Sequence, residues 1–115
     1  STSGMKVSLR MAKQRITNRI FMVTLASEPT GLYPAQVQKV RLEITSGKTE
    51  IGITVAAAYG FDEASRELTV ECDRLNSVTL MLSSDTMPER VTITAIDPQS
   101  QVALDTLRDV PVDLM

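Results

Sequence analysis

The sequence predicts an all-β domain, an antiparallel β-sandwich of about eight short strands. Three observations support this prediction. Apolar and polar residues alternate with a period of two through most of the chain, turn-forming residues interrupt the alternation about every ten residues, and no segment shows the periodicity of a helix longer than about ten residues. Because this alternation leaves one face of each strand in contact with water, we expect the sheets to be antiparallel.

The amino-terminal part of the chain predicts two strands joined by a polar connection. Apolar residues occupy every second position over 5–11, which is typical of a half-buried strand, and the strongly apolar segment 20–26 is typical of a central strand. Residues 12–19 are mostly polar and are expected to connect the two. A helix over 5–25 is the competing interpretation, and the strict alternation at its start disfavours it.

The middle of the chain predicts a hairpin between two loops. Glycine and proline residues indicate a loop over 27–34. Alternating segments at 40–44 and 51–57 then flank a turn signal at 46–48, so we expect them to pair as a hairpin. Residues 59–63 are expected to form the loop that follows.

Two further strands are expected over 68–72 and 78–82, where apolar and polar residues again alternate. Leu75 and Val78 are out of step with each other, which predicts a tight turn or a bulge between them. A loop is expected over 83–88.

The carboxyl-terminal part predicts a final pair of strands. A strand over 91–95 is followed by a turn signal at 97–100 and by apolar residues that start another strand at Val102. A last short strand is expected over 110–114. Pro111 lacks an N–H group and cannot donate to a ladder of hydrogen bonds, so this strand is expected to be an edge.

The segment from Glu89 to Val112, with its strand, turn and final strand, resembles the last hairpin of immunoglobulin-like bacterial domains. The resemblance covers about a fifth of the chain. It implies a sandwich that is immunoglobulin-like in its broad architecture. It implies no function, because one fold hosts many functions.

Length and composition predict a single domain over residues 1–115, with residues 1–4 as a flexible, linker-like start. Apolar residues make up 43% of the chain but aromatic residues only 3%, so we expect a core of aliphatic side chains. The single cysteine, Cys72, excludes an internal disulfide and is expected to be a small buried residue of a strand. A small residue at position 1 suits either removal of an initiator methionine or cleavage of a longer leader.

The residue types present remove most routes to catalysis and to metal binding. The chain has no histidine, which excludes Ser-His-Asp triads, Cys-His pairs and histidine metal sites. Its five glycines are scattered and form no phosphate-binding loop. The acidic residues near predicted loops lack the close spacing of a calcium site and are expected to be solvated. We therefore predict no enzymatic activity, no catalytic residue, no metal and no cofactor.

The distribution of charge is the most distinctive feature of the sequence. Residues 1–27 carry five basic residues and no acidic one, whereas the remainder carries seven basic and fourteen acidic residues. We expect the five to meet an acidic protein surface, such as that of a second copy of the chain, and a solvated strand face is the plain alternative. The predicted partner-binding residues are Lys6, Arg10, Lys13, Arg15 and Arg19.

Other partners are less favoured by the sequence. An isoelectric point near 5.1 and the scarcity of aromatic residues disfavour nucleic acid. The terminal segments 5–11 and 110–114 could complete the sheet of a neighbouring subunit, although each is more simply a strand of its own sheet. The chain contains no run of about 18 apolar residues, so no membrane insertion is expected.

These expectations favour a non-enzymatic structural or interaction module, a subunit of an extracellular, cell-envelope or virion assembly rather than a cytoplasmic protein. The alternative is a carbohydrate- or ligand-binding accessory domain, for which the aromatic candidates in predicted loops are Tyr33, Tyr59 and Phe61. A small enzyme that uses carboxylates alone is the third interpretation, and it requires two acids that converge in a pocket.

Overall fold

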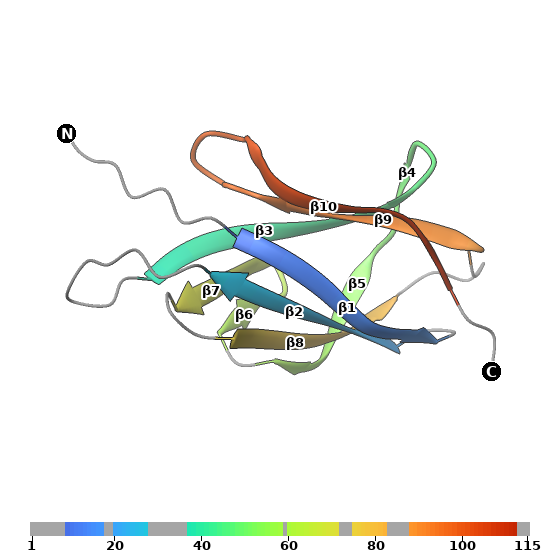
Figure 1. Cartoon of the computed structure of the whole chain (residues 1–115), viewed down its shortest axis with the longest axis horizontal. Coiled ribbons are helices and arrows are strands. Elements are labelled where there is room, and N and C mark those ends of the chain that lie inside the picture. The colour runs from blue at the N-terminus through green and yellow to red at the C-terminus, as the bar shows by residue number, and fades with distance from the viewer. Residues whose placement is uncertain are drawn as a thin grey trace.

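A computed structural model describes residues 9–17, 20–27, 37–58, 60–71, 75–82 and 88–112. Within these residues the regular secondary structure is entirely β, with no helix. The strands form two antiparallel sheets, and in Figure 1 the strands β10, β9 and β3 of one sheet lie above β1, β2 and β8 of the other. The prediction of an all-β fold with antiparallel sheets is confirmed. Several predicted features lie outside the described residues: the start over 1–4, the first half of the strand over 5–11, most of the loops over 27–34 and 83–88, and Cys72.

The first sheet, called sheet A, has four strands. The hairpin of β1 (Leu9–Thr17) and β2 (Ile20–Ser27) forms one side of it, and β2 confirms the strand predicted over 20–26. β2 also pairs with β8 (Leu75–Leu82), which pairs in turn with β5 (Ile53–Ala58). The order β1-β2-β8-β5 makes β1 and β5 the edges of sheet A.

The second sheet, called sheet B, has six strands. Its continuous order is β10 (Ala103–Pro111), β9 (Arg90–Ile96), β3 (Val37–Ser46), β7 (Glu67–Glu71) and β6 (Phe61–Asp62). The two-residue strand β4 (Thr49–Glu50) also pairs with β3, beside this path. β10 and β6 are therefore edges of sheet B, which confirms that Pro111 lies in an edge strand.

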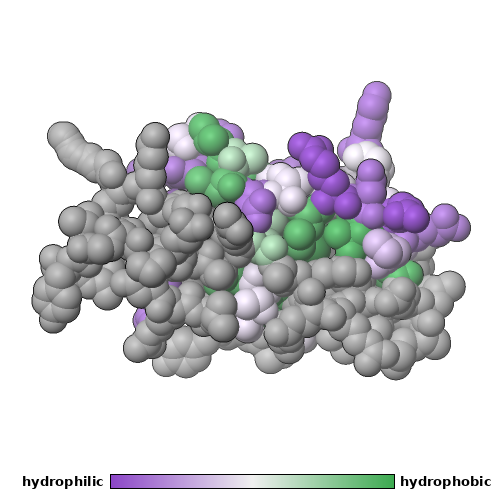
Figure 2. Space-filling view, in the orientation of Figure 1, coloured by the Kyte–Doolittle hydropathy of each residue, from purple (hydrophilic) through white to green (hydrophobic). Residues whose placement is uncertain are grey.

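One cluster of buried apolar side chains takes its members from both sheets. In β3, Val40, Leu42 and Ile44 are buried, whereas Arg41 and Glu43 between them are partly exposed. Burial of each such aliphatic side chain contributes about 1.5–3 kcal/mol to folding. The cluster consists of Val, Leu, Ile, Ala and Met residues, which confirms the predicted aliphatic core. In Figure 2 the described residues are mostly hydrophilic at the upper right, with apolar side chains below them and at the upper left.

β1 is longer than the sequence predicts. It continues to Thr17, so the connection predicted over 12–19 is wrong for its first six residues. A shift of register between Lys13 and Arg15 lets this polar segment remain paired with β2. An extra residue in one strand breaks the period-two pattern without ending the strand, and the pattern is all that the sequence displays.

The prediction that 40–44 and 51–57 pair as a hairpin is wrong beyond Ile51. β3 pairs with β4 around the turn, and the Ile51 N–H donates to the Ile44 carbonyl oxygen at 2.8 Å. The chain then leaves sheet B and continues as β5 in sheet A. Alternation reports which face of a strand is buried and says nothing of which strand it pairs with, so it does not reveal this crossing.

Two smaller predictions are also wrong. β8 is continuous from Leu75 to Leu82, without the predicted turn or bulge between Leu75 and Val78. The irregularity lies on the neighbouring strand β5, between Val55 and Ala57. Residues 61–62 pair as β6, within the predicted loop over 59–63.

β10 is one strand where the sequence predicts two short ones. Its register against β9 shifts before Asp105 and again before Val110, and these bulges interrupt the alternation. Asp109, in the second bulge, adopts a left-handed φ of 48°. The turn predicted over 97–100 is confirmed, and the Gln101 N–H closes it by donating to the Asp97 carbonyl oxygen at 2.8 Å.

Candidate functional site

The charged residues of the strands divide between the two sheets. In sheet A, β1 carries Arg10, Lys13 and Arg15 and no acidic residue, and β2, β5 and β8 carry no charged residue at all. The strands of sheet B carry four basic and seven acidic residues, a net charge of −3. The difference in charge between the two parts of the sequence therefore becomes a difference in charge between the strands of the two sheets.

Three of the five predicted partner-binding residues lie together on the edge strand β1. They are Arg10, Lys13 and Arg15. The other two, Lys6 and Arg19, lie outside the described residues. The outer side of this edge strand has no neighbour in its own sheet, but part of it contacts β10 of sheet B.

The register of β1 places its basic residues on different faces. Lys13 is opposite Val23, which is fully buried, whereas Arg15 is opposite Met22, one position further along β2. Residues opposite each other in an antiparallel pair share a face. The extra residue Gln14 therefore separates an inner-face position at Lys13 from an outer-face position at Arg15. The basic residues of β1 therefore do not share one face of the strand.

The acidic charge of sheet B is concentrated in the hairpin of β6 and β7. The turn between these strands is built on Asp62, whose Oδ1 accepts hydrogen bonds from the Ala64 N–H at 2.9 Å and the Ser65 N–H at 3.4 Å. Arg66 follows with a left-handed φ of 59° and pairs with Glu50. The acidic residues of the hairpin are Asp62, Glu63, Glu67 and Glu71.

The basic edge strand and the acidic hairpin lie on opposite sides of the molecule. β1 contacts β10, the edge of sheet B that is farthest from β6 in the strand order. This contact includes a hydrogen bond from the Met11 N–H to Asp105 Oδ2 at 2.7 Å. Asp105 Oδ1 accepts a second one from the Thr106 N–H at 2.9 Å. β1 and β10 thus lie together at one end of the two strand orders, whereas β5 and β6 are the strands at the other ends.

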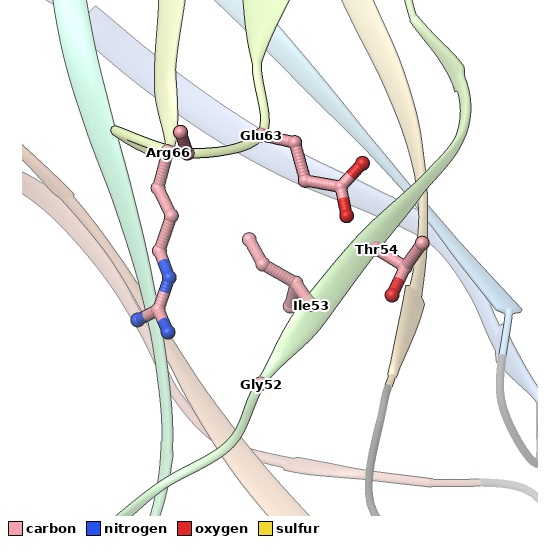
Figure 3. A pocket seen from close by; sticks show the side chains of 6 residues that line it. Gly52, Ile53, Thr54, Glu63 and Arg66 are labelled. Atoms are coloured by element: carbon pink, nitrogen blue, oxygen red, sulfur yellow. The ribbon is translucent and has the colours of Figure 1, made fainter.

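A shallow pocket lies on the β5–β6 side. It has a volume near 520 Å³, and its lining residues are Gly52, Ile53, Thr54, Glu63, Ala64 and Arg66. Figure 3 shows Ile53 pointing from β5 into the space between Glu63 and Arg66, which both come from the β6–β7 turn. Ile53 is only 7% exposed, so the floor of the pocket is apolar and part of the core.

The pocket offers little catalytic or metal-binding chemistry. Glu63 is the one carboxylate among its lining residues, so two acids do not converge there. The Arg66 guanidinium is engaged by Glu50. In the part of the chain that the structure describes, no three Cys, Asp or Glu side chains are grouped to hold a metal ion.

The aromatic residues proposed for ligand binding do not form a described patch. Phe61 is partly buried and packs against the core cluster. Tyr33 and Tyr59 lie outside the described residues. Stacking of a sugar ring requires an exposed aromatic face, and the packing of Phe61 removes one of the three candidates.

Sequence reasoning missed the outer face of sheet A. The register aligns Arg15, Met22, Thr79 and Ala57 as one row across its four strands. In this row only Arg15, at the β1 end, is charged. A signal was present in the sequence, since the segments 20–27, 53–58 and 75–82 contain no charged residue. Alternation alone did not show that these three segments become neighbours.

No protein-family model matches this chain, and no curated protein and no solved structure is significantly similar to it. Among the described residues there is no helix of the length and hydrophobicity needed to span a bilayer.

Proposed function

We propose that the chain is a non-enzymatic interaction module that acts as a subunit of an extracellular, cell-envelope or virion assembly. The observation that carries this proposal is the division of charge, with three positive charges on the β1 edge of sheet A and a net charge of −3 on sheet B. A module of this kind docks by presenting one charged surface to a complementary one.

The fold that we propose for this module is an immunoglobulin-like sandwich. Immunoglobulin-type domains place their first, second, fifth and fourth strands in one sheet and their third, sixth and seventh in the other. The order β1-β2-β8-β5 fits the first set, and β10-β9-β3 fits the second. The β6–β7 hairpin is then an addition to the outer side of β3, which is where the acidic residues are concentrated.

The preferred partner is a second copy of the chain, docked head to tail. Because the basic strand and the acidic hairpin lie on opposite sides, contact between them leaves one free basic and one free acidic surface. Such a heterologous contact can repeat. Each exposed ion pair contributes only about 0.2–1 kcal/mol, so several pairs act together and mainly set orientation and association rate.

Sedimentation velocity over a range of salt concentrations tests this proposal. We expect association at about 25 mM NaCl that weakens steeply toward about 0.5 M, where the screening length falls below about 5 Å. The charge reversals Arg10→Glu and Arg15→Glu together should abolish this salt-sensitive association. Arg108→Glu, an exposed basic position on sheet B, is the matched control and should retain it.

A mixing experiment identifies the acidic surface. Glu63→Lys with Glu67→Lys should also abolish the salt-sensitive association. Mixing this variant with the β1 reversal should restore pairs, because each contributes the surface that the other has lost. A chain that stays monomeric at low salt, or that associates equally well after the β1 reversal, contradicts the proposal.

A further inference from the structure

The outer face of sheet A is unusual because three of its four strands carry no charged residue. β2, β5 and β8 together contain 22 residues and no Asp, Glu, Lys or Arg. At the chain's average of 23% charged residues, about five would be expected. Antiparallel sheets that face water normally place charged and polar residues on that face.

The pairing register identifies which residues occupy this face. Val23, Leu25, Val78 and Leu80 are fully buried, so the residues that alternate with them belong to the outer face. Ser77 is exposed, and Thr24, Thr79, Met81 and Thr54 are partly exposed. The outer-face positions are Ile20, Met22, Thr24 and Ala26 of β2, Leu75, Ser77, Thr79 and Met81 of β8, and Thr54 and Ala57 of β5.

The outer face of sheet B shows what an ordinary solvated face of this chain looks like. On β3 it carries Lys39, Arg41 and Glu43, which alternate with the buried Val40, Leu42 and Ile44. Arg41 is held between Glu43 Oε2 at 3.4 Å and Gln101 Oε1 at 2.9 Å. The two outer faces belong to the same molecule, so the difference between them is a property of sheet A and not of the whole composition.

We infer that the outer face of sheet A is the contact surface for a second copy of this chain, packed face to face across a two-fold axis. Interface centres are depleted of charged residues and bury apolar and small polar side chains, as this face offers. Its hydroxyl groups also have partners available on the face, since Thr24 Oγ1 and Ser77 Oγ lie 3.4 Å apart. Burial of satisfied hydroxyls carries a smaller penalty than burial of unpaired ones.

The size of the face fits a weak dimer. Four strands about 4.8 Å apart and about eight residues long, at about 3.4 Å per residue, cover about 500 Å² per copy. Two copies would then bury about 1,000 Å², which is at the lower limit for a specific interface. We therefore expect dissociation constants in the micromolar range rather than an obligate dimer.

The charges on β1 favour a second copy of the chain as the partner on this face, and they determine how the two copies are oriented. An acidic partner would be attracted to β1 at the edge and would gain nothing from the uncharged centre, whereas a second copy brings the same uncharged centre to the contact. Stacking β1 on β1 would oppose Arg10 and Arg15 to their own equivalents. A two-fold axis parallel to the strands avoids this repulsion, because it stacks β1 on the uncharged β5 and β2 on β8.

Matched Thr→Lys substitutions on the two outer faces test the inference. The wild-type chain should dimerise in sedimentation equilibrium at about 0.5 M NaCl, where the electrostatic docking proposed above is screened. Thr79→Lys, at the centre of the sheet A face, should weaken this dimer at least tenfold. Thr94→Lys, on the outer face of sheet B between Glu43 and Thr106, should leave it unchanged.

The possible results of these substitutions lead to different conclusions about the dimer. Circular dichroism and thermal unfolding establish whether both variants fold. If Thr79→Lys does not fold, Ser77→Lys, at an exposed position, replaces it. A wild-type chain that remains monomeric at high salt up to about 1 mM, or equal weakening by Thr79→Lys and Thr94→Lys, overturns the inference. Loss of the low-salt association in the β1 charge reversal, with the high-salt dimer retained, supports both proposals as separate contacts.

Discussion

The backbone N–H of Met11 donates to the Asp105 carboxylate at 2.7 Å, and this hydrogen bond connects the edge strand of one sheet to the edge strand of the other. Met11 is 7% exposed and belongs to the core cluster. An edge strand presents unpaired N–H groups that can recruit another chain. The Asp105 carboxylate accepts a hydrogen bond from one of these N–H groups. The bulge that precedes Asp105 in β10 sets the direction of the Asp105 side chain.

Removal of the Asp105 carboxylate should therefore loosen this side of the molecule. Asp105→Ala should lower the free energy of unfolding by about 1–3 kcal/mol, because it leaves the Met11 N–H and the Thr106 N–H without their acceptor. Chemical denaturation measures the loss, and hydrogen exchange should accelerate at the Met11 amide. Asp109→Asn is the control on the same strand. It keeps a residue type that tolerates φ of 48° and should change stability by less than about 0.5 kcal/mol.

Truncation of a side chain that joins the two sheets should be far more costly than truncation at the surface. Leu80 of β8 is fully buried in the cluster shared by both sheets. Leu80→Ala should lower the free energy of unfolding by about 2–5 kcal/mol through lost burial and a residual cavity. Val102, which is 57% exposed, provides the control. Val102→Ala should cost less than about 0.5 kcal/mol in urea denaturation, and similar losses for the two variants would contradict a common core.

The turn between β3 and β4 depends on the backbone freedom of Gly47. Its φ is +61°, and a Cβ added there would meet no atom within 4 Å. The cost of Gly47→Ala should therefore come from conformation alone and amount to about 1 kcal/mol in thermal or chemical unfolding. Gly47→Asn should cost less, because asparagine visits the left-handed region more readily. An equal cost for both substitutions would show that contacts rather than backbone conformation decide this position.

The ion pair between Arg66 and Glu50 should contribute little to stability. Their side chains are 30% and 50% exposed, so water and salt screen the attraction. Glu50→Gln should change the free energy of unfolding by less than about 1 kcal/mol, and the difference should shrink further at about 0.5 M NaCl. A larger, salt-independent loss in chemical denaturation would mean that the pair holds the β6–β7 turn in place against β4.

Alternation in the sequence is sufficient to predict the fold class and most strands. Val40, Leu42 and Ile44 are spaced two apart because their side chains enter one core, and the same spacing recurs at Val91, Ile93 and Ala95. The pattern fails where a bulge adds a residue, as at Gln14 in β1 and before Asp105 in β10. Alternation also cannot reveal that the chain leaves sheet B after β4 and enters sheet A as β5, because the same face of this strand would be buried in either sheet.

The candidate site was less predictable than the fold. The charge difference along the sequence singles out Arg10, Lys13 and Arg15, but the sequence places only Arg10 in a strand and predicts a connection at Lys13 and Arg15, whereas all three lie on β1. That these residues form the only charges in the strands of sheet A depends on which strands become neighbours, and this is a long-range property. The separation of Lys13 from Arg15 by the bulge depends on register, which the sequence does not encode locally.

The division of charge between the strands of the two sheets also gives the described part of the molecule a permanent electric moment. About three positive charges on the β1 edge of one layer oppose about three negative charges on a layer about 10 Å away. In an external field, or near a charged surface, the molecule should therefore orient before it makes contact. The net charge of −2 is then a poor guide to its behaviour, and both cation and anion exchangers should retain it at low ionic strength, each by a different side.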